Sequence, residues 1–382
     1  MNETIFLLKH KNNTVMTFTL NSNFHICSIL EINDKERLPL YLQEYNVAIT
    51  NQFFDDWINS RCIPINRENI DRALPKLGVS NSRLLITKWF FASLTDHYWI
   101  TPKLSEVMWE DINLFQNSFI DNFGNILMGT AQKTISMKTP DTSLGGQLKK
   151  KWKIVDDVRT LIKDGSGESK QEIFNEVIAT EICNRLNIHC IPYSLFQQEN
   201  NVYCACPCFA SNDVEFVSAY DVLGTIKNDY TISMYEHYIT TLENYGISNV
   251  RQKLEHMLLL DFIIGNIDRH FNNFGVLRNS DTLEFIDVVP IFDTGSSLGS
   301  NKAAPFFHID KNDEICSFEI DEFTQFHLIK NKYDLSALNN IDIWVKDFLT
   351  KTQYVYPEKI DKIIQFLNYR IEYAISYFKL HF

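Results

Sequence analysis

The chain has 382 residues, of which 45% are hydrophobic and 22% are charged, and its formal net charge at pH 7 is −12. The length allows two or three domains with a sizeable core, and the hydrophobic content is that of an ordinary globular protein. The acidic balance argues against a free-standing nucleic-acid-binding protein, because contacts to phosphates need local lysine and arginine side chains. We therefore expect no direct nucleic-acid binding.

Export and membrane insertion are not expected either. Met1-Asn2-Glu3 has no basic residue, and the apolar stretch Phe6-Leu7-Leu8 is too short for the core of a signal peptide. The longest apolar run, around Met257 to Ile264, is interrupted by Asp261 and is far shorter than a membrane span. The expected location is the cytoplasm, with no membrane partner.

The N-terminal third predicts strands followed by helices. Alternating apolar residues on either side of Asn12-Asn13 are typical of a hairpin, and the later segments carry helix signals. The expected elements are hairpin strands at 4–11 and 14–20 and helices at 51–59, 67–74 and 82–93.

A turn with two glycines, Gly145-Gly146-Gln147, stands before a predicted strand pair. Apolar residues alternate on both sides of Asp156-Asp157, so we expect a β-hairpin whose second strand ends at Lys163. Glycines let backbone N–H groups approach a phosphate, and a lysine at the end of a neighbouring strand can reach the same oxygens. The lysines at 149–151 are as readily a solvated face, whereas Lys163 closes an apolar strand.

The next segment, Gln171 to Leu186, predicts a helix with one apolar stripe. In a protein kinase, a helix at this place supplies the glutamate that pairs with the strand lysine. By helical angle Glu181 lies at the centre of the stripe, while Glu176 lies off it. The pattern alone favours Glu181 as the inward carboxylate.

Three of the eight cysteines, Cys204, Cys206 and Cys208, alternate along one segment. A period of two places them on one side of a strand. A zinc site would need C-x-x-C spacing and a second ligand pair, and disulfides are unusual in a reducing cytosol. Buried strand cysteines are favoured over metal binding. In a kinase, this strand would lead into the hinge that holds adenine.

The most informative stretch is 265–273, in which Asp268 and Asn273 have the D-x-x-x-x-N spacing of a protein-kinase catalytic loop. Further on, Asp293 begins a D-x-G triplet. Phosphoryl transfer needs a carboxylate to orient the attacking hydroxyl and oxygen ligands to hold Mg²⁺. Asp268 is the candidate for the first role, and Asn273 and Asp293 are the candidates for the second.

The D-x-x-x-x-N spacing alone is weak, because Asp and Asn are common in solvated turns. The neighbouring elements strengthen it. A buried helix is predicted over 250–264, and two short strands over 274–277 and 283–289 return the chain to the same place. A final helix, 357–378, carries an apolar stripe that we expect to close a helical domain rather than to lie on a membrane.

Together these motifs resemble the HipA family of bacterial serine/threonine kinases. The resemblance covers residues 140–300 and rests on the segment Thr142 to Lys163, Asn175-Glu176-Val177, Asn266 to His270 with Asn273, and Pro290 to Asp293. It implies an α+β, two-lobed protein-kinase-like fold with an accessory domain at 1–135, a small β-rich lobe at 136–212 and a helical large lobe at 213–382.

The resemblance also implies roles for single residues. Lys163 would hold the α- and β-phosphates of ATP, and the Asn-Glu pair of the family favours Glu176 over Glu181 as its partner. Gly145-Gly146-Gln147 and His270 would contact the nucleotide. The residues Thr294-Gly295 after Asp293 depart from the apolar residues usual in the family and look like those of ordinary kinases.

The implied function is phosphorylation of a serine or threonine hydroxyl of a protein, with ATP and Mg²⁺ as cofactors and an antitoxin-like protein as regulator. HipA-type kinases can also modify a hydroxyl just ahead of the glycine turn, where Thr142 and Ser143 stand. The alternative is a catalytically silent nucleotide-binding module, or a toxin-antitoxin docking partner, with the same fold. Because every catalytic residue type is present, we favour the enzyme.

Overall fold

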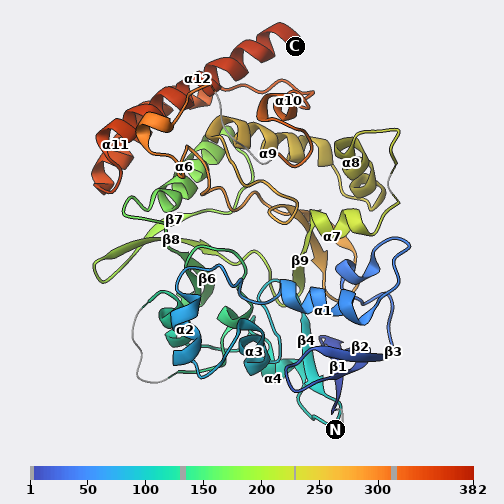
Figure 1. Ribbon diagram of the computed structural model, residues 1–382. Coiled ribbons are helices and arrows are strands. Elements are labelled where there is room, and N and C mark those ends of the chain that lie inside the picture. Colours follow the sequence, from blue (N-terminus) through green and yellow to red (C-terminus); the bar gives the residue numbers. More distant parts are fainter. Residues whose placement is uncertain (1–3, 130–134, 228, 311–315) are drawn as a thin grey trace. The chain divides into compact units, whose positions relative to one another are not determined.

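The structure is a computed structural model that describes residues 4–129, 135–227, 229–310 and 316–382 (Figure 1). Residues 1–3, on which part of the expectation about export rests, lie outside the described residues. The chain forms two compact units of mixed α and β structure. Unit 1 comprises 1–163, 207–228 and 277–286, and unit 2 comprises 164–206, 229–276 and 287–382. The three domains expected from the sequence stay a prediction.

Unit 1 begins with a four-stranded antiparallel sheet in the order β3-β2-β1-β4. Its strands are β1 (Thr4–His10), β2 (Asn13–Leu20), β3 (Ile26–Ile32) and β4 (Tyr98–Pro102). The predicted N-terminal hairpin is therefore confirmed.

The helices of unit 1 are short, and only the first follows the expected span. α1 begins after Thr50, whose side chain accepts a hydrogen bond from the Phe53 N–H, as an N-cap residue does. The helix expected at 82–93 ends at Ile86, because a 3-10 turn follows and Phe90 and Phe91 adopt left-handed φ angles of 54° and 60°. These helices are α1 (Asn51–Ser60), α2 (Ile70–Lys76), α3 (Ser82–Ile86), α4 (Trp109–Ile112), α5 (Asn122–Leu127) and α7 (Ala219–Gly224).

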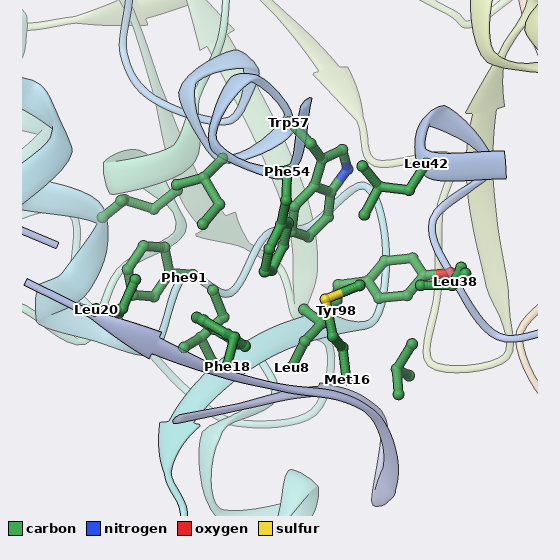
Figure 2. Packing of buried hydrophobic residues seen from close by; sticks show 14 of the residues in the cluster. Leu8, Met16, Phe18, Leu20, Leu38, Leu42, Phe54, Trp57, Phe91 and Tyr98 are labelled. Carbon is green, nitrogen blue, oxygen red and sulfur yellow. The ribbon is translucent and has the colours of Figure 1, made fainter. Parts of the chain in front are cut away.

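The core of this part of unit 1 lies between the first sheet and α1 (Figure 2). Phe18 of β2 and Phe54 of α1 pack edge to face, with ring centroids 4.9 Å apart. Trp57 and Tyr98 extend the same cluster, with ring centroids 5.8 Å apart. The sheet and α1 are thus held together by buried aromatic side chains.

A polar cluster is buried elsewhere in unit 1. One carboxylate oxygen of Glu215 lies 3.1 Å from Nε2 of His10 and 3.2 Å from Nδ1 of His97, and the other accepts from Nε of Arg278 at 2.7 Å. Burial raises the pKa of Glu215, but Arg278 and His10 lower it more, so that the pKa lies well below its ordinary value. The cluster joins the N-terminal sheet to the later segments of the unit.

The second strand pair of unit 1 is the predicted hairpin of β5 (Lys150–Val155) and β6 (Val158–Lys163). Asp156 and Asp157 have φ angles of 47° and 63°, as a tight two-residue hairpin turn requires. Lys150 pairs with Lys163, so Lys163 is the last residue of its strand as expected.

Unit 2 is mainly helical, and its two central helices have the spans expected from the sequence, α6 (Gln171–Leu186) and α9 (Val250–Ile264). The other elements of unit 2 are β7 (Ser194–Gln198), β8 (Asn201–Pro207), α8 (Met234–Asn244), α10 (Glu322–Phe326), α11 (Ile341–Thr352) and α12 (Pro357–His381). The short strands expected around residue 280 are β10 (Gly275–Asn279) and β11 (Phe285–Val288), next to β9 (Val214–Ser218).

The C-terminal helix α12 packs against α9 and α11 (Figure 1). Its Arg370 is fully buried, with the guanidinium 4.6 Å from the ring centre of Phe262 and 2.9 Å from a carboxylate oxygen of Glu322. The apolar stripe of α12 therefore belongs to the core of unit 2. None of the helices within the described residues is long and apolar enough to cross a membrane.

Candidate active site

The loop that carries the D-x-x-x-x-N motif begins where α9 ends. Gly265 adopts a left-handed φ of 59°, which stops the helix and is readily reached only without a Cβ. The next N–H, of Asn266, donates to the carbonyl of Asp261 at 3.0 Å. The chain thereby leaves the helix in a fixed direction.

Arg269 holds this loop together from inside. Its guanidinium binds both carboxylate oxygens of Asp261, at 2.8 and 3.0 Å, and also donates to the carbonyls of Asn273 at 2.6 Å and Phe292 at 2.9 Å. Burial lowers the pKa of Arg269, but the Asp261 carboxylate raises it more, so the side chain stays charged. Helix α9, the end of the loop and the segment before Asp293 are therefore joined by one side chain.

The sequence did not reveal this role of Arg269 and Asp261. The available signal was Asp261 itself, because an acid inside an otherwise apolar helical run needs a charged partner. Arg269 is 1% exposed, which identifies it as that partner rather than as a solvated loop residue.

The side chain of Asp268, unlike that of Arg269 next to it, is partly open to solvent. Its backbone N–H donates to Oδ1 of Asn266 at 3.1 Å, whereas its side chain is 43% exposed. The imidazole of His270 lies beside it, with Nε2 3.7 Å from Oδ1 of Asp268. A fixed backbone with an accessible carboxylate suits a group that must meet an external hydroxyl.

Asn273 closes the loop on Asp268. Its Nδ2 donates to the backbone carbonyl of Asp268 at 2.9 Å, and its N–H donates to the carbonyl of His270 at 2.8 Å. No group among the described residues donates to Oδ1 of Asn273. The amide is thus oriented with its nitrogen occupied and its oxygen, a ligand type that Mg²⁺ accepts, still available.

The D-x-G triplet is attached to the start of α6. Oε2 of Glu176 accepts from the N–H and the hydroxyl of Thr294, at 2.9 and 2.7 Å. Asn175 donates through Nδ2 to the carbonyls of Gly295 and Ser297, at 2.9 and 2.7 Å. The Asn-Glu pair therefore fixes the backbone that carries Asp293.

Two backbone features explain this local geometry. Asp293 has a left-handed φ of 56°, unusual for a residue with a Cβ, and its N–H donates to the hydroxyl of Tyr193 at 3.3 Å. A Cβ at Gly295 would lie 3.0 Å from the carbonyl oxygen of Glu172, so a glycine lets the turn approach α6. The strain at Asp293 is held by contacts on both sides.

The two glutamates of α6 have different surroundings. Glu176 is 2% exposed and faces the D-x-G turn, whereas Glu181 forms an ion pair of 2.8 Å with Arg185 that is partly open to solvent. The helical-angle argument predicted an inward-facing Glu181, but its carboxylate lies in a partly exposed ion pair instead. The pairing of Glu176 with Lys163 stays a prediction.

Unit 1 carries the other predicted nucleotide contacts. Gly145-Gly146-Gln147 is exposed, and Gly146 has a left-handed φ of 84°. Lys163 is buried at the end of β6.

Thr142 is fully buried, and the hydroxyl of Ser143 donates to the carbonyl of Ala92 at 3.0 Å, so neither hydroxyl is presented to an external group in this conformation.

The alternating cysteines do not form a metal site within the described residues. The one group of His, Cys, Asp and Glu side chains there that is close enough to hold an ion is the cluster of Glu215 with His10 and His97. Arg278 already pairs with that carboxylate. Cys204 and Cys206 are buried, and burial raises the pKa of the Cys208 thiol to about 12. The cysteines behave as core residues.

Comparison with known proteins shows which family and which relatives this chain is similar to. The model of the HipA-like C-terminal domain matches residues 131–351. Among curated proteins, the serine/threonine-protein kinase CtkA of Helicobacter pylori is 28% identical over 192 residues, which are 47% of this chain and 55% of the relative. The chain thus spans about half the length of that relative.

Two solved structures are similar. HipA of Shewanella oneidensis MR-1, in a complex with HipB and its operator DNA, aligns with a TM-score of 0.55 and 11% identity over 98% of this chain and 99% of that chain. The proinflammatory kinase CtkA of H. pylori aligns with a TM-score of 0.47 and 20% identity over 60% of this chain and 94% of that chain. The alignment with HipA shows a shared fold.

The family match extends over more than half of the chain and includes the glycine turn, α6, the catalytic-type loop and the D-x-G turn. This confirms the family that the sequence motifs indicated. The chain belongs to the family of proteins with a HipA-like C-terminal domain.

Proposed function

We propose that this chain is a protein kinase that transfers the γ-phosphoryl group of ATP to a serine or threonine hydroxyl, with Mg²⁺. The observation that carries the proposal is the way Arg269 and the Asn175-Glu176 pair fix Asp268, Asn273 and the D-x-G turn in one unit. Membership of the family and similarity to CtkA, a serine/threonine kinase, support it.

Each residue has a role that fits its surroundings. Asp268, exposed and next to His270, accepts the hydrogen bond of the attacking hydroxyl and takes its proton as the oxygen attacks. Oδ1 of Asn273 and the carboxylate of Asp293 would hold Mg²⁺, which neutralises charge on the phosphates when bound. Most of the catalysis then comes from positioning, which explains why so many contacts serve to fix the backbone of two short loops.

The nucleotide contacts are proposed from unit 1 and from α6. The N–H groups of Gly145-Gly146-Gln147 would bind the phosphates, Lys163 would hold the α- and β-phosphates, and Glu176 would position Lys163. His270 would contact the nucleotide beside Asp268. A two-lobed kinase arrangement, with the hinge after β8 holding adenine, belongs to the same proposal.

The second candidate is a silent nucleotide-binding or docking module with the same fold. It is favoured by the similarity to HipA in a complex with HipB, a protein that works with a partner. An antitoxin-like regulatory protein is accordingly a proposed partner of this chain under either function. The exposed Asp268 carboxylate favours the enzyme, because a silent module has no need of an accessible carboxylate at this position.

The test is phosphoproteomics and a radiolabelled ATP assay with the wild type and Asp268→Asn. We expect the variant to lose phosphoryl transfer by at least about 10²-fold, the size of a general-base contribution, with an unchanged melting temperature. Asp361→Asn is the matched control, because Asp361 is exposed in a surface ion pair with Lys346 that contributes little. Near wild-type transfer by Asp268→Asn would remove its assigned role, and ATP binding without transfer by the wild type would favour the silent module.

A further inference from the structure

Arg67, a residue of the N-terminal third, is buried against the glycine turn. It is 2% exposed, and its guanidinium donates to three consecutive carbonyl groups. Nη2 binds the oxygens of Leu144 and Gly145, the latter at 2.5 Å, and Nε binds that of Gly146 at 2.9 Å. These charge-assisted bonds span 77 to 79 residues of sequence, so they hold the turn from outside its own hairpin.

The next residue continues the same contact. The N–H of Glu68 donates to the carbonyl of Gln147 at 3.4 Å, and its carboxylate lies 2.8 Å from Nζ of Lys149. Residues 67 and 68 therefore touch the turn at every position from 144 to 147. The ion pair of Glu68 with Lys149 is partly exposed, so it stabilises the turn little, and most of the stabilisation comes from Arg67.

The direction of the carbonyl groups decides where the N–H groups point. All peptide bonds of the described residues are trans, and in a trans peptide the C=O and the following N–H point in opposite directions. Carbonyls 144 to 146 face Arg67, so the N–H groups of Gly145-Gly146-Gln147 face away from it. These three residues are exposed, and no group among the described residues accepts a hydrogen bond from their N–H groups.

Successive N–H groups directed outward form an anion-binding nest, for which one residue in the left-handed region is typical. Gly146 supplies it, with φ 84°. A cation also lies beside the nest, because a Cβ built at Gly146 would meet Nζ of Lys150. The carbonyl end of each peptide dipole thus faces Arg67, and its N–H end faces the side on which an anion could bind.

We propose that Arg67 is the positioning residue of the phosphate-binding turn. It holds three carbonyl groups on one side so that three N–H groups are ready for the phosphates on the other. The inference rests on the proposed function of the turn and adds that the N-terminal third controls it. Arg67 does not touch the nucleotide, and its effect is to remove the ordering cost from binding.

The test compares ATP with adenosine, which has no phosphates. We expect Arg67→Leu to weaken ATP binding by about tenfold or more, the loss typical of a charge-assisted hydrogen-bond set, and to leave adenosine binding unchanged. Arg67→Lys should recover only part, because a point charge cannot serve three carbonyls in a fork. Arg72→Leu, an exposed arginine of α2, is the matched control for charge.

Two further measurements separate the possible failures. Trypsin should cut after Lys149 and Lys150 faster in Arg67→Leu than in the wild type, because the turn is released. Gly146→Ala, which strains a left-handed residue without touching Arg67, should copy the loss of ATP affinity even if Arg67→Leu folds poorly.

Equal ATP affinity in wild type and Arg67→Leu, or an unchanged rate of cleavage, would overturn the role of Arg67 while leaving the kinase proposal intact. Wild-type protein that binds ATP no better than adenosine would overturn the nest itself. By contrast, normal ATP binding that depends on Arg67, without phosphoryl transfer, would contradict only the proposed function.

Discussion

Buried charges explain several single-residue features of this chain. Asp261 and Arg269 form a bidentate pair inside unit 2, and Asp141 lies fully buried beside the glycine turn of unit 1. Oδ1 of Asp141 accepts from the N–H of Trp152 at 2.6 Å, and Oδ2 accepts from the hydroxyl of Thr139 at 2.9 Å. Two bonds do not replace full hydration, so the charged form of this acid is disfavoured.

The pH dependence of stability follows from Asp141. Burial raises its pKa from 3.8 to about 7, against the lowering effect of its hydrogen bonds and of Lys151. Between these two pKa values the folded state binds a proton that the unfolded state releases. The contribution of this proton to the free energy of unfolding is therefore fully present below pH 4 and is lost as the pH rises toward 7. Between pH 5 and 8 this acid removes on the order of 2–3 kcal/mol from the free energy of unfolding.

Asp141→Asn should abolish that part of the pH dependence. The measurement is the free energy of unfolding in urea at pH 5 and pH 8 for both proteins. Asp221, another buried acid with a pKa raised to about 6, is present in both and cancels in the difference. The same loss of stability with rising pH in both proteins would show that Asp141 does not titrate in this range.

At the scale of elements, α6 and α9 could be predicted from the sequence because each is long and carries apolar residues along its whole length. The shorter helix expected at 82–93 failed where two phenylalanines take left-handed angles, a feature that no periodicity reports. Glu181 was misplaced by the same kind of reasoning: helical angle finds the face of a helix, but the D-x-G turn contacts α6 near its start, at Asn175 and Glu176.

The first prediction for α6 concerns its glutamates. Glu176→Gln should reproduce the defect of Lys163→Met, a roughly tenfold or greater loss in ATP affinity or turnover, because each would remove one side of the ion pair that we propose between them. Glu181→Gln is the matched control and should behave as the wild type, since Glu181 lies partly open to solvent in an ion pair with Arg185. The double variant of Lys163 and Glu176 should be little worse than either single one. If Glu181→Gln gave the defect instead, the assignment would be reversed.

The second prediction at this scale concerns the 3-10 turn Pro140–Ser143 ahead of the glycines. Incubation with Mg·ATP should place phosphate on Ser143 rather than Thr142, because Ser143 is half-buried while Thr142 is fully buried. The phosphate on Ser143 should break the contact with Ala92 and compete with the phosphates of ATP for the lysines near the turn. The modified protein should therefore bind ATP at least about tenfold more weakly.

Intact-mass measurement and peptide mapping check that modification, with Ser143→Ala as the control. Phosphate on neither hydroxyl of an otherwise active enzyme would contradict it. Modification that leaves ATP affinity unchanged would mean that the turn does not need its present conformation.

At the scale of the whole molecule, the sequence motifs were enough to identify the family but not to place the N-terminal third. Arg67 lies outside every motif, and its contact with residues 144–146 links positions almost eighty residues apart, which no local pattern encodes. The core shows the same property. Trp152 of β5 packs in one cluster with Trp99 and Trp109, on the other side of the boundary expected at residue 135.

A fragment of residues 136–382 should therefore not fold as the full chain does. It loses the first sheet, Arg67 and the partners of Trp152, and we expect a chain without cooperative unfolding that binds the dye ANS. Co-expression of residues 1–135 as a separate chain is the control and should restore ATP binding. A fragment that unfolds cooperatively and binds ATP alone would show that the N-terminal third is a true accessory domain.

The buried cluster around Glu215 also sets an order of events during synthesis. Glu215 is synthesised 118 residues after His97 and 205 residues after His10. At a translation rate of about 5–20 residues per second, the first delay alone is on the order of ten seconds, much longer than a small sheet needs to form. The nascent N-terminal strands thus leave the ribosome with two imidazoles lacking their carboxylate, and unit 1 can be completed only after Arg278 has emerged. A chaperone that shields this incomplete sheet would act on the growing chain rather than on the finished protein.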